Sequence, residues 1–543
     1  MRVLTGFLCA VLLSAPLAWC DDEHHHALTA EEVGSVHFLT SCSKSVALSF
    51  NRAVAVLHSF QYEQARQAFS DVASRDPKCA MAQWGIAMSY YHGLWKNGNT
   101  AAGRDAFEKA KAVAAANPTT ARELAYIEAL DEIYREDDKD QATHDRAFEQ
   151  KMGAVQAAYP TDSEAAIFHA LTLDIAASKT DKTFANQQKC GEILEPLLKS
   201  QPHHPGIPHY IIHCYDNPVL AEKSLGAARI YAKIAPASAH ANHMPSHIFT
   251  RLGLWDESIR SNIRSEKLAA EAEATSTNGE ARDQRLHAMD YEAYAYLQSG
   301  QVKQAEAVLA KMNSLPPTGA LTLTGDYALA AIPARCAIEL GNWKAASDLQ
   351  VRKESVPWAQ AITWAAIGEG SARAGDLDRA ALAEQTLTSL VDASAKRNNT
   401  YWSNQVEVQR REVAAWIAEK SGKSIEAIAA MKSAAELEES MDKDAVTPGP
   451  VTPAREMLAE LLLLEKRPQE ALAEYEAVLR VAPNRFNALF GAASAADAAG
   501  NSAFADRYFR KLSEISVGEE RPELVTAHKR IAVTAEKNSV THP

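Results

Sequence analysis

Long apolar runs and positive charges are both scarce in this sequence of 543 residues. A helix that crosses a bilayer needs about 20 predominantly apolar residues, and the run from Leu4 to Leu13 is shorter than that. Lys and Arg number 56 against 69 Asp and Glu, which gives a net charge of −13. An acidic surface repels a polyanionic phosphate backbone, so the sequence predicts no nucleic-acid partner. The short apolar run predicts no transmembrane segment.

Motifs that mark several enzyme classes are missing as well. The sequence contains no GxSxG elbow, no GxxxxGK phosphate loop, no GxGxxG dinucleotide turn and no CxxC or HExxH pair. Hydrolase, nucleotide, dithiol and zincin interpretations therefore lack support. No motif marks a nucleophile or a base, so an enzymatic activity is the least favoured function.

Cysteine is rare, and its positions agree with export. Two of the seven cysteines, Cys9 and Cys20, lie within the first 20 residues. There Arg2, the apolar run and the sequence Ala18-Trp19-Cys20 resemble a secretory signal peptide at residues 1–20. We expect a periplasmic or secreted protein. A lipoprotein acylated at Cys20 is the alternative, which Trp19 disfavours because the lipoprotein signal requires a small residue there.

Repeated helical hairpins organise the rest of the chain. Residues 50–77 place Tyr62, Ala65, Phe69 and Pro77 in a helix-turn-helix pattern. Similar segments follow at Leu252–Ile259, Gln298–Leu309, Leu340–Ser347, Ala374–Ala381, Ser421–Ile428, Arg467–Pro483 and Ala499–Phe509. The pattern resembles the tetratricopeptide repeat (TPR). The resemblance implies an all-α, right-handed superhelix of antiparallel helix pairs, with a concave groove that commonly binds a protein or peptide.

The segments Asp76–Trp95 and His243–Trp255 also resemble a group of exported bacterial TPR proteins. That resemblance implies the fold and no particular activity. We divide the chain into a signal peptide (1–20), an N-terminal segment (21–44), a solenoid (45–447), a proline-rich break (448–453), C-terminal repeats (454–518) and a capping helix with its tail (519–543). The break rests on closely spaced prolines, which cannot continue a helix.

Histidines recur with the period of the repeats. His209 and His213 form one i, i+4 pair, and His243 and His247 form a second pair that lies 34 residues later. A shift of one repeat places residues at equivalent positions of neighbouring helices, so we expect these four imidazoles to converge on the groove. Further candidates for the same inner face or for a second shell are Asp216, His240, Arg251, His287, Asp290 and Tyr294.

Neutral imidazole is the commonest protein ligand for zinc and copper. The four histidines therefore form a candidate site for one of these metals, although histidines that pack against neighbours or cap helices would give the same spacing. The predicted function is an exported TPR scaffold that binds a protein or peptide partner, with a histidine-lined concave groove as a candidate transition-metal site. The alternatives are a zinc or copper protein for storage or sensing, and a metal-dependent enzyme that uses the same site.

A disulfide between Cys42 and Cys79 is predicted from the repeat pattern. Each cysteine precedes the first helix of a unit, and first helices of adjacent units begin close together. In an oxidising compartment this bond would stabilise the fold by about 3–4 kcal/mol. Five cysteines follow the signal peptide, so at least one thiol stays outside an intramolecular disulfide.

Overall fold

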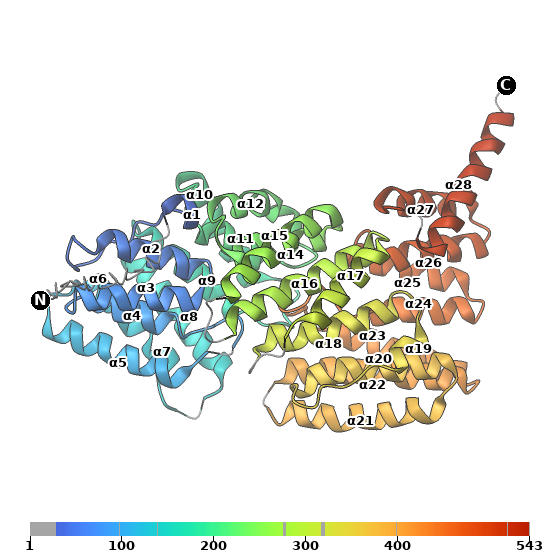
Figure 1. Cartoon of the computed structure of the whole chain (residues 1–543), viewed down its shortest axis with the longest axis horizontal. Helices are drawn as coiled ribbons and strands as arrows, with labels where there is room; N and C mark the ends of the chain where they lie inside the picture. The colour runs from blue at the N-terminus through green and yellow to red at the C-terminus, as the bar shows by residue number, and fades with distance from the viewer. Residues whose placement is uncertain are drawn as a thin grey trace, which may run out of the picture.

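The computed structural model describes residues 29–541, except 97, 138, 275–278, 317–320, 398 and 519. The predicted signal peptide and Cys20 lie outside the described residues. Within them, helices are the only regular secondary structure, and they pack as successive antiparallel pairs (Figure 1). The predicted all-α solenoid is therefore confirmed. None of the helices in this part of the chain is long and apolar enough to cross a membrane.

Helices α1 to α12 form the N-terminal end of the superhelix. They are α1 (Ala30–Val33), α2 (Ala47–His58), α3 (Tyr62–Arg75), α4 (Ala80–Met88), α5 (Thr100–Ala116), α6 (Ala121–Ala129), α7 (Asp131–Tyr134), α8 (Gln141–Ala158), α9 (Ser163–Ile175), α10 (Ala185–Ser200), α11 (Gly206–Tyr215) and α12 (Ala221–Ile234). Small residues allow the close contacts between neighbours. A Cβ atom at Gly85 of α4 would collide with the Phe69 ring of α3, so glycine sets how closely these helices pack.

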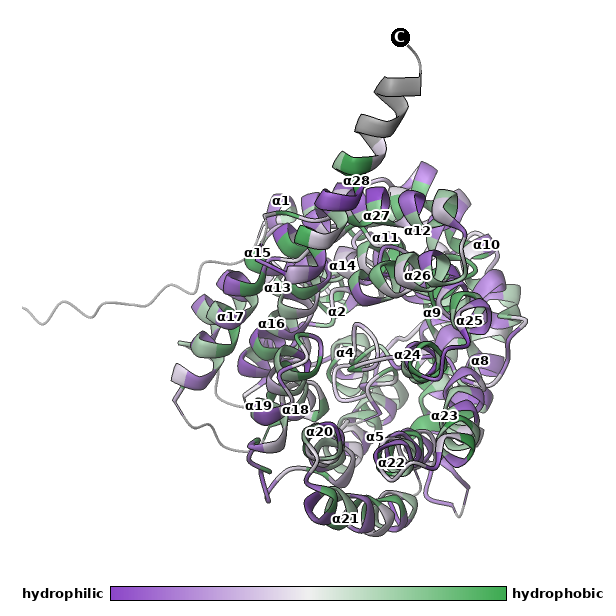
Figure 2. Ribbon diagram, turned by 90° about the vertical axis from the view of Figure 1, so that its right-hand side faces the viewer, coloured by the Kyte–Doolittle hydropathy of each residue, from purple (hydrophilic) through white to green (hydrophobic). Residues whose placement is uncertain are grey.

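The middle of the chain continues the same winding. Its helices are α13 (Ala239–His243), α14 (Pro245–Arg251), α15 (Trp255–Glu273), α16 (Glu280–Gln298), α17 (Val302–Ser314), α18 (Leu323–Ile338), α19 (Trp343–Ser347), α20 (Pro357–Ala374), α21 (Leu377–Ala395), α22 (Thr400–Lys420) and α23 (Ser424–Glu439). Viewed along the long axis, α17 and α21 lie outside α16 and α20 (Figure 2). The first helices of the units therefore line the inner face.

The C-terminal helices turn back onto the middle of the chain. They are α24 (Ala454–Leu464), α25 (Pro468–Val481), α26 (Phe486–Ala498), α27 (Ser502–Ile515) and α28 (Pro522–Thr541). The indole Nε1 of Trp255 donates to the carbonyl of Asn484 at 3.0 Å, and the Val517 amide donates to the carbonyl of Ser299 at 2.9 Å. Buried Arg485 ion-pairs with Glu339 and Glu456. These contacts close the superhelix on itself.

A segment without helix, residues 440–453, joins α23 to α24 and contains the predicted proline-rich break. It enters the inner face of the superhelix. Arg335 of α18 donates to the carbonyls of Gly449 and Pro450, both at 2.7 Å, and Tyr291 of α16 donates to the carbonyl of Thr447 at 3.0 Å. The chain thus occupies part of its own concave groove.

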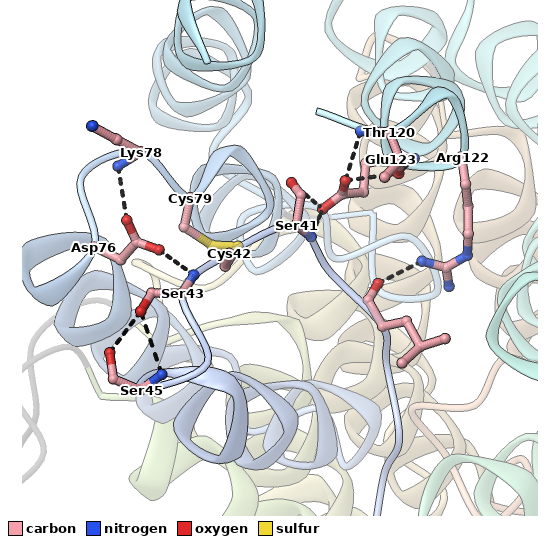
Figure 3. The surroundings of a disulfide bond; sticks show 11 residues. Ser41, Cys42, Ser43, Ser45, Asp76, Lys78, Cys79, Thr120, Arg122 and Glu123 are labelled. Carbon is pink, nitrogen blue, oxygen red and sulfur yellow. Dashed lines mark hydrogen bonds between the residues drawn. A yellow bond between two sulfur atoms is a disulfide. The ribbon is translucent and has the colours of Figure 1, made fainter. Parts of the chain in front are cut away.

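Two disulfides hold the N-terminal part of the superhelix, between Cys42 and Cys214. Cys42 is bonded to Cys79, with 4.7 Å between their Cα atoms, and Asp76 accepts from the amide of Ser43 beside the bond (Figure 3). Cys190 of α10 is bonded to Cys214 of α11, a pairing that the sequence did not indicate. Cys336 is a buried free thiol.

Candidate metal centre

Four helices bring six histidines together. Three of these helices, α11, α14 and α16, are labelled near the middle of the superhelix in Figure 1. All six histidines are buried, with at most 7% of the surface of any one exposed. Helix α11 carries His209 and His213, α13 carries His240 and His243, α14 carries His247 and α16 carries His287.

The six imidazoles sort into two triads. We call His209, His213 and His240 the first triad, and His243, His247 and His287 the second triad. One ligand nitrogen from each member lies within 4.8 Å of the other two in both triads. The imidazole rings of His213 and His247, one from each triad, have centroids 6.1 Å apart. The four histidines expected to share one ion are therefore divided between two neighbouring sites, and His240 and His287 each complete one of them.

In two imidazoles of the second triad, those of His243 and His247, hydrogen bonds fix which nitrogen carries the proton. Nδ1 of His247 lies 2.8 Å from a carboxylate oxygen of Asp216, and Nδ1 of His243 lies 2.7 Å from the amide oxygen of Asn262. Both partners are acceptors, so Nδ1 is the protonated nitrogen of each neutral ring. The two Nε2 atoms then carry lone pairs, and they lie only 3.0 Å apart.

In the first triad, a hydrogen bond fixes the proton of one imidazole. Nδ1 of His209 donates to the backbone carbonyl of His58 at 2.6 Å, which leaves its Nε2 as the lone-pair atom, 3.0 Å from Nε2 of His240. Nε2 of His213 is buried without a hydrogen-bond partner, as are both ring nitrogens of His287 in the second triad. Buried nitrogen atoms that lack partners are costly. One ion in each triad would satisfy Nε2 of His213 and one of the two ring nitrogens of His287.

Burial keeps these imidazoles neutral. Loss of hydration is the largest cause that lowers the histidine pKa values, and charge repulsion from neighbouring imidazoles adds to it. For His209, His213, His240, His243 and His287 these effects hold the pKa well below the ordinary value. Neutral imidazole is the form that ligates a metal.

Aromatic rings close the cluster from the sides. The Tyr231 ring stacks on His209 with centroids 5.0 Å apart, and the Phe60 ring meets His209 at 4.4 Å. The Tyr291 ring lies 4.8 Å from both His243 and His247. These rings exclude water from the imidazoles and restrict their rotation.

A charged group lies behind the second triad. Burial raises the pKa of Asp216, but Lys443 and Arg251 outweigh it and hold that pKa well below its ordinary value. Asp216 therefore stays ionised and accepts from Arg251 at 2.8 Å, from Lys443 at 2.7 Å and from His247. A carboxylate that receives the second imidazole proton is the usual outer partner of a metal-bound histidine.

Two predicted inner-face residues lie away from the triads. Asp290 pairs with Arg335 at 2.9 Å, and the Tyr294 hydroxyl accepts from Arg485 at 3.3 Å. The sequence pattern did not indicate Tyr291 or Asn262, which contact the second triad directly. Tyr291 follows His287 by one helical turn, and that i, i+4 spacing could have identified it.

A third cluster lies near the first triad. The Glu164 carboxylate bridges Nε2 of His58 at 3.0 Å and Nε2 of His204 at 2.9 Å, and the Tyr210 hydroxyl lies 2.8 Å from Nδ1 of His58. Hydrogen bonds within the chain already satisfy both carboxylate oxygens. This cluster therefore connects α2, α9 and α11 and supports the position of His209.

No family model and no curated protein matches this sequence. Among solved structures, the chain is similar to the human IFIT1 dimer with m7Gppp-AAAA, at 13% identity over 80% of this chain and 90% of that chain, with a TM-score of 0.33. It is also similar to yeast Tom70, at 10% identity over 84% of this chain and 89% of that chain, with a TM-score of 0.32. At these scores the likeness carries no argument about function. The class that the helices define is a TPR-like α-solenoid.

Proposed function

We propose that this protein is an exported metal-binding solenoid that holds two zinc or copper ions, one in each histidine triad. The observation that carries the proposal is the pair of Nε2 atoms of His243 and His247, 3.0 Å apart with both protons directed elsewhere. Two lone pairs that face each other in a buried site repel unless a cation lies between them.

The donor set selects the metal. Both triads offer only imidazole nitrogen, which suits zinc and copper, whereas calcium, magnesium and manganese prefer oxygen ligands. In a tetrahedral site with bonds of about 2.0–2.1 Å, two ligand nitrogens lie about 3.3 Å apart. The triads therefore need only small side-chain rotations to bind an ion.

Each triad leaves a fourth position for water or another small ligand, as catalytic zinc sites do. A cavity of about 50 Å³ borders His213, Asp216 and Lys443 and could hold such a ligand beside the first triad. Export is supported by the two disulfides, because such bonds persist in oxidising compartments.

A peptide scaffold is the second candidate function. The observation in its favour is that the inner face already holds an extended chain, residues 440–453, through the carbonyls that Arg335 and Tyr291 bind. A foreign peptide would have to displace this segment or bind at another part of the groove.

Metal analysis of the exported protein, purified without an affinity tag, tests the proposal. We expect about two zinc or copper ions per chain. After the metal has been removed with a chelator, the metal-free protein should bind two zinc or copper ions per chain in equilibrium dialysis and no magnesium. Stripped protein that takes up neither zinc nor copper would contradict the proposal. Peptide binding by that same protein would then favour the scaffold.

A further inference from the structure

A second enclosed region lies on the inner face beyond the histidines. A cavity of about 690 Å³ is bordered by α20, α22 and α25 and by the segment 440–453. This volume falls within the range of about 300–1,000 Å³ that is typical of small-molecule sites. None of the six triad histidines lines it.

The cavity has two chemically different ends. Along α22 it is lined by Trp402, Gln405, Gln409 and Glu412, and along α20 by Trp358, Ile362, Ala365 and Glu369. Spacings of three and four residues place each set on one face of its helix. Helices α20 and α22 run in the same direction because the antiparallel α21 lies between them in sequence. The two tryptophans therefore lie at one end of the cavity and the two glutamates at the other. The two ends are about 15 Å apart along the helix axes.

Aromatic rings form the first end. The Trp358 and Trp402 rings are stacked with centroids 5.9 Å apart, and the Tyr401 ring meets Trp402 edge-on at 5.0 Å. Trp358 is 9% exposed, and its indole Nε1 is buried without a hydrogen-bond partner. This end can receive a flat or apolar group and offers it one donor.

Carboxylates form the second end. Among the described residues, Glu412 has no hydrogen bond or ion pair to a cation, although it is only 7% exposed. Burial and the nearby Glu438 and Glu369 charges raise its pKa well above the ordinary value. Burial also raises the pKa of Glu438 to about 7.

The neighbouring cations are already paired or solvated. Arg251 and Lys443 bind Asp216, Arg455 binds Glu439 and Glu474, and Arg373 binds Glu369 and Glu460. Lys182 and Arg480 are exposed. Glu412 thus lacks a compensating positive charge. Among the described residues, this carboxylate belongs to none of the groups close enough to hold a metal ion, and it borders the cavity, where a cation could pair with it.

We propose that this cavity binds an amphipathic organic cation, with its ammonium group at Glu412 and its apolar or aromatic body beside Trp358 and Trp402. The proposal is independent of the metal sites. The ligand would gain a charge-assisted hydrogen bond at one end and the burial of its body at the other.

The probe is 4-phenylbutylamine, with 4-phenylbutan-1-ol and 4-phenylbutyrate as matched neutral and anionic controls. We expect calorimetry on the full chain, with and without metal, to show that the amine binds at least about tenfold more tightly than the alcohol and that the carboxylate does not bind. Binding of the amine should also change the tryptophan fluorescence. Equal binding of all three compounds, or no binding of the amine, would overturn the proposal.

Two variants locate the site. Glu412→Gln should weaken amine binding about tenfold or more while leaving alcohol binding unchanged, because only the charge is removed. The matched control is Glu436→Gln on α23, whose carboxylate is exposed and does not border the cavity. Unchanged amine binding in the Glu412 variant would also overturn the proposal. Glutamine has nearly the same shape as the carboxyl group, whose raised pKa favours the protonated form in the folded protein, so this variant should fold.

Discussion

The histidine triads and the tryptophan–glutamate cavity occupy the inner face of one solenoid, yet they present opposite chemistry. In the triads, buried nitrogen atoms face one another across about 3 Å, too close for anything larger than an ion. In the cavity, apolar and acidic groups lie at opposite ends of a space of about 690 Å³. Helix pairs build both regions, so the fold supplies the surface and individual side chains decide what it binds.

The largest effect is expected when one metal ligand is removed from each triad. His213→Phe combined with His287→Phe should abolish zinc and copper binding, while His287→Phe alone should reduce it from two ions to one. The ring nitrogens of His287 have no hydrogen-bond partner, so its replacement should leave metal-free stability nearly unchanged.

The matched control is His169→Gln, which alters a buried histidine bonded to Gln156 and Glu149, away from the triads. Metal analysis and thermal unfolding provide the two readouts. A double variant that still binds two ions would show that the triads are packing features.

Arg335→Met tests the segment that lies between the two regions. This change leaves the buried Asp290 carboxylate without its partner and frees the carbonyls of Gly449 and Pro450. We expect a loss of about 3–5 kcal/mol in the free energy of unfolding, measured by denaturant titration. Adding Asp290→Asn should recover part of the loss, and a double variant as unstable as the single one would contradict the ion-pair explanation.

The fold and part of the triads could be predicted from the sequence. The interval of 34 residues places His209 and His243 at equivalent positions, which was enough to predict that the pairs are neighbours. Their division into triads was not predictable, because the third member of each triad, His240 or His287, lies outside the two i, i+4 pairs. The packing of α13 on α16 and of their neighbours brings these two histidines to the pairs.

Long-range contacts explain the rest. The prolines at residues 448–453 indicated an interruption, but the entry of this segment into the groove depends on Arg335, more than 100 residues earlier in the chain. The Cys190–Cys214 bond depends on how α10 packs on α11. Trp358 and Trp402 belong to no sequence motif. Aromatic residues at helical spacing are usually core residues, so nothing in the sequence indicated that these two border a cavity.

Removal of the Cys190–Cys214 disulfide should affect the triads more than the cavity. The bond encloses a sequence separation of 24 residues and holds α11, which carries His209 and His213. Replacing both cysteines by serine should lower the free energy of unfolding by about 3–4 kcal/mol. Metal affinity should fall and binding of 4-phenylbutylamine should not, whereas an equal loss at both sites would indicate general loosening of the fold.

The smallest expected effect is a pH dependence at the acidic end of the cavity. The folded pKa of Glu412 is raised above its unfolded value, so ionisation disfavours the native state and stability falls as pH rises above about 4.5. Glu412→Gln should therefore be more stable than the native protein at pH 7–8, by about 1 kcal/mol or more, and equal to it near pH 4. A constant difference across this range of pH would contradict the assignment.

The binding of one ion by each triad can be tested by diffraction from crystals of the zinc- or copper-loaded protein, recorded on both sides of the metal absorption edge. We expect two anomalous peaks. One should lie about 2.0–2.1 Å from one nitrogen each of His209, His213 and His240, and the other at the same distance from one nitrogen each of His243, His247 and His287. Peaks outside the triads, or none at all in protein that carries metal, would contradict it.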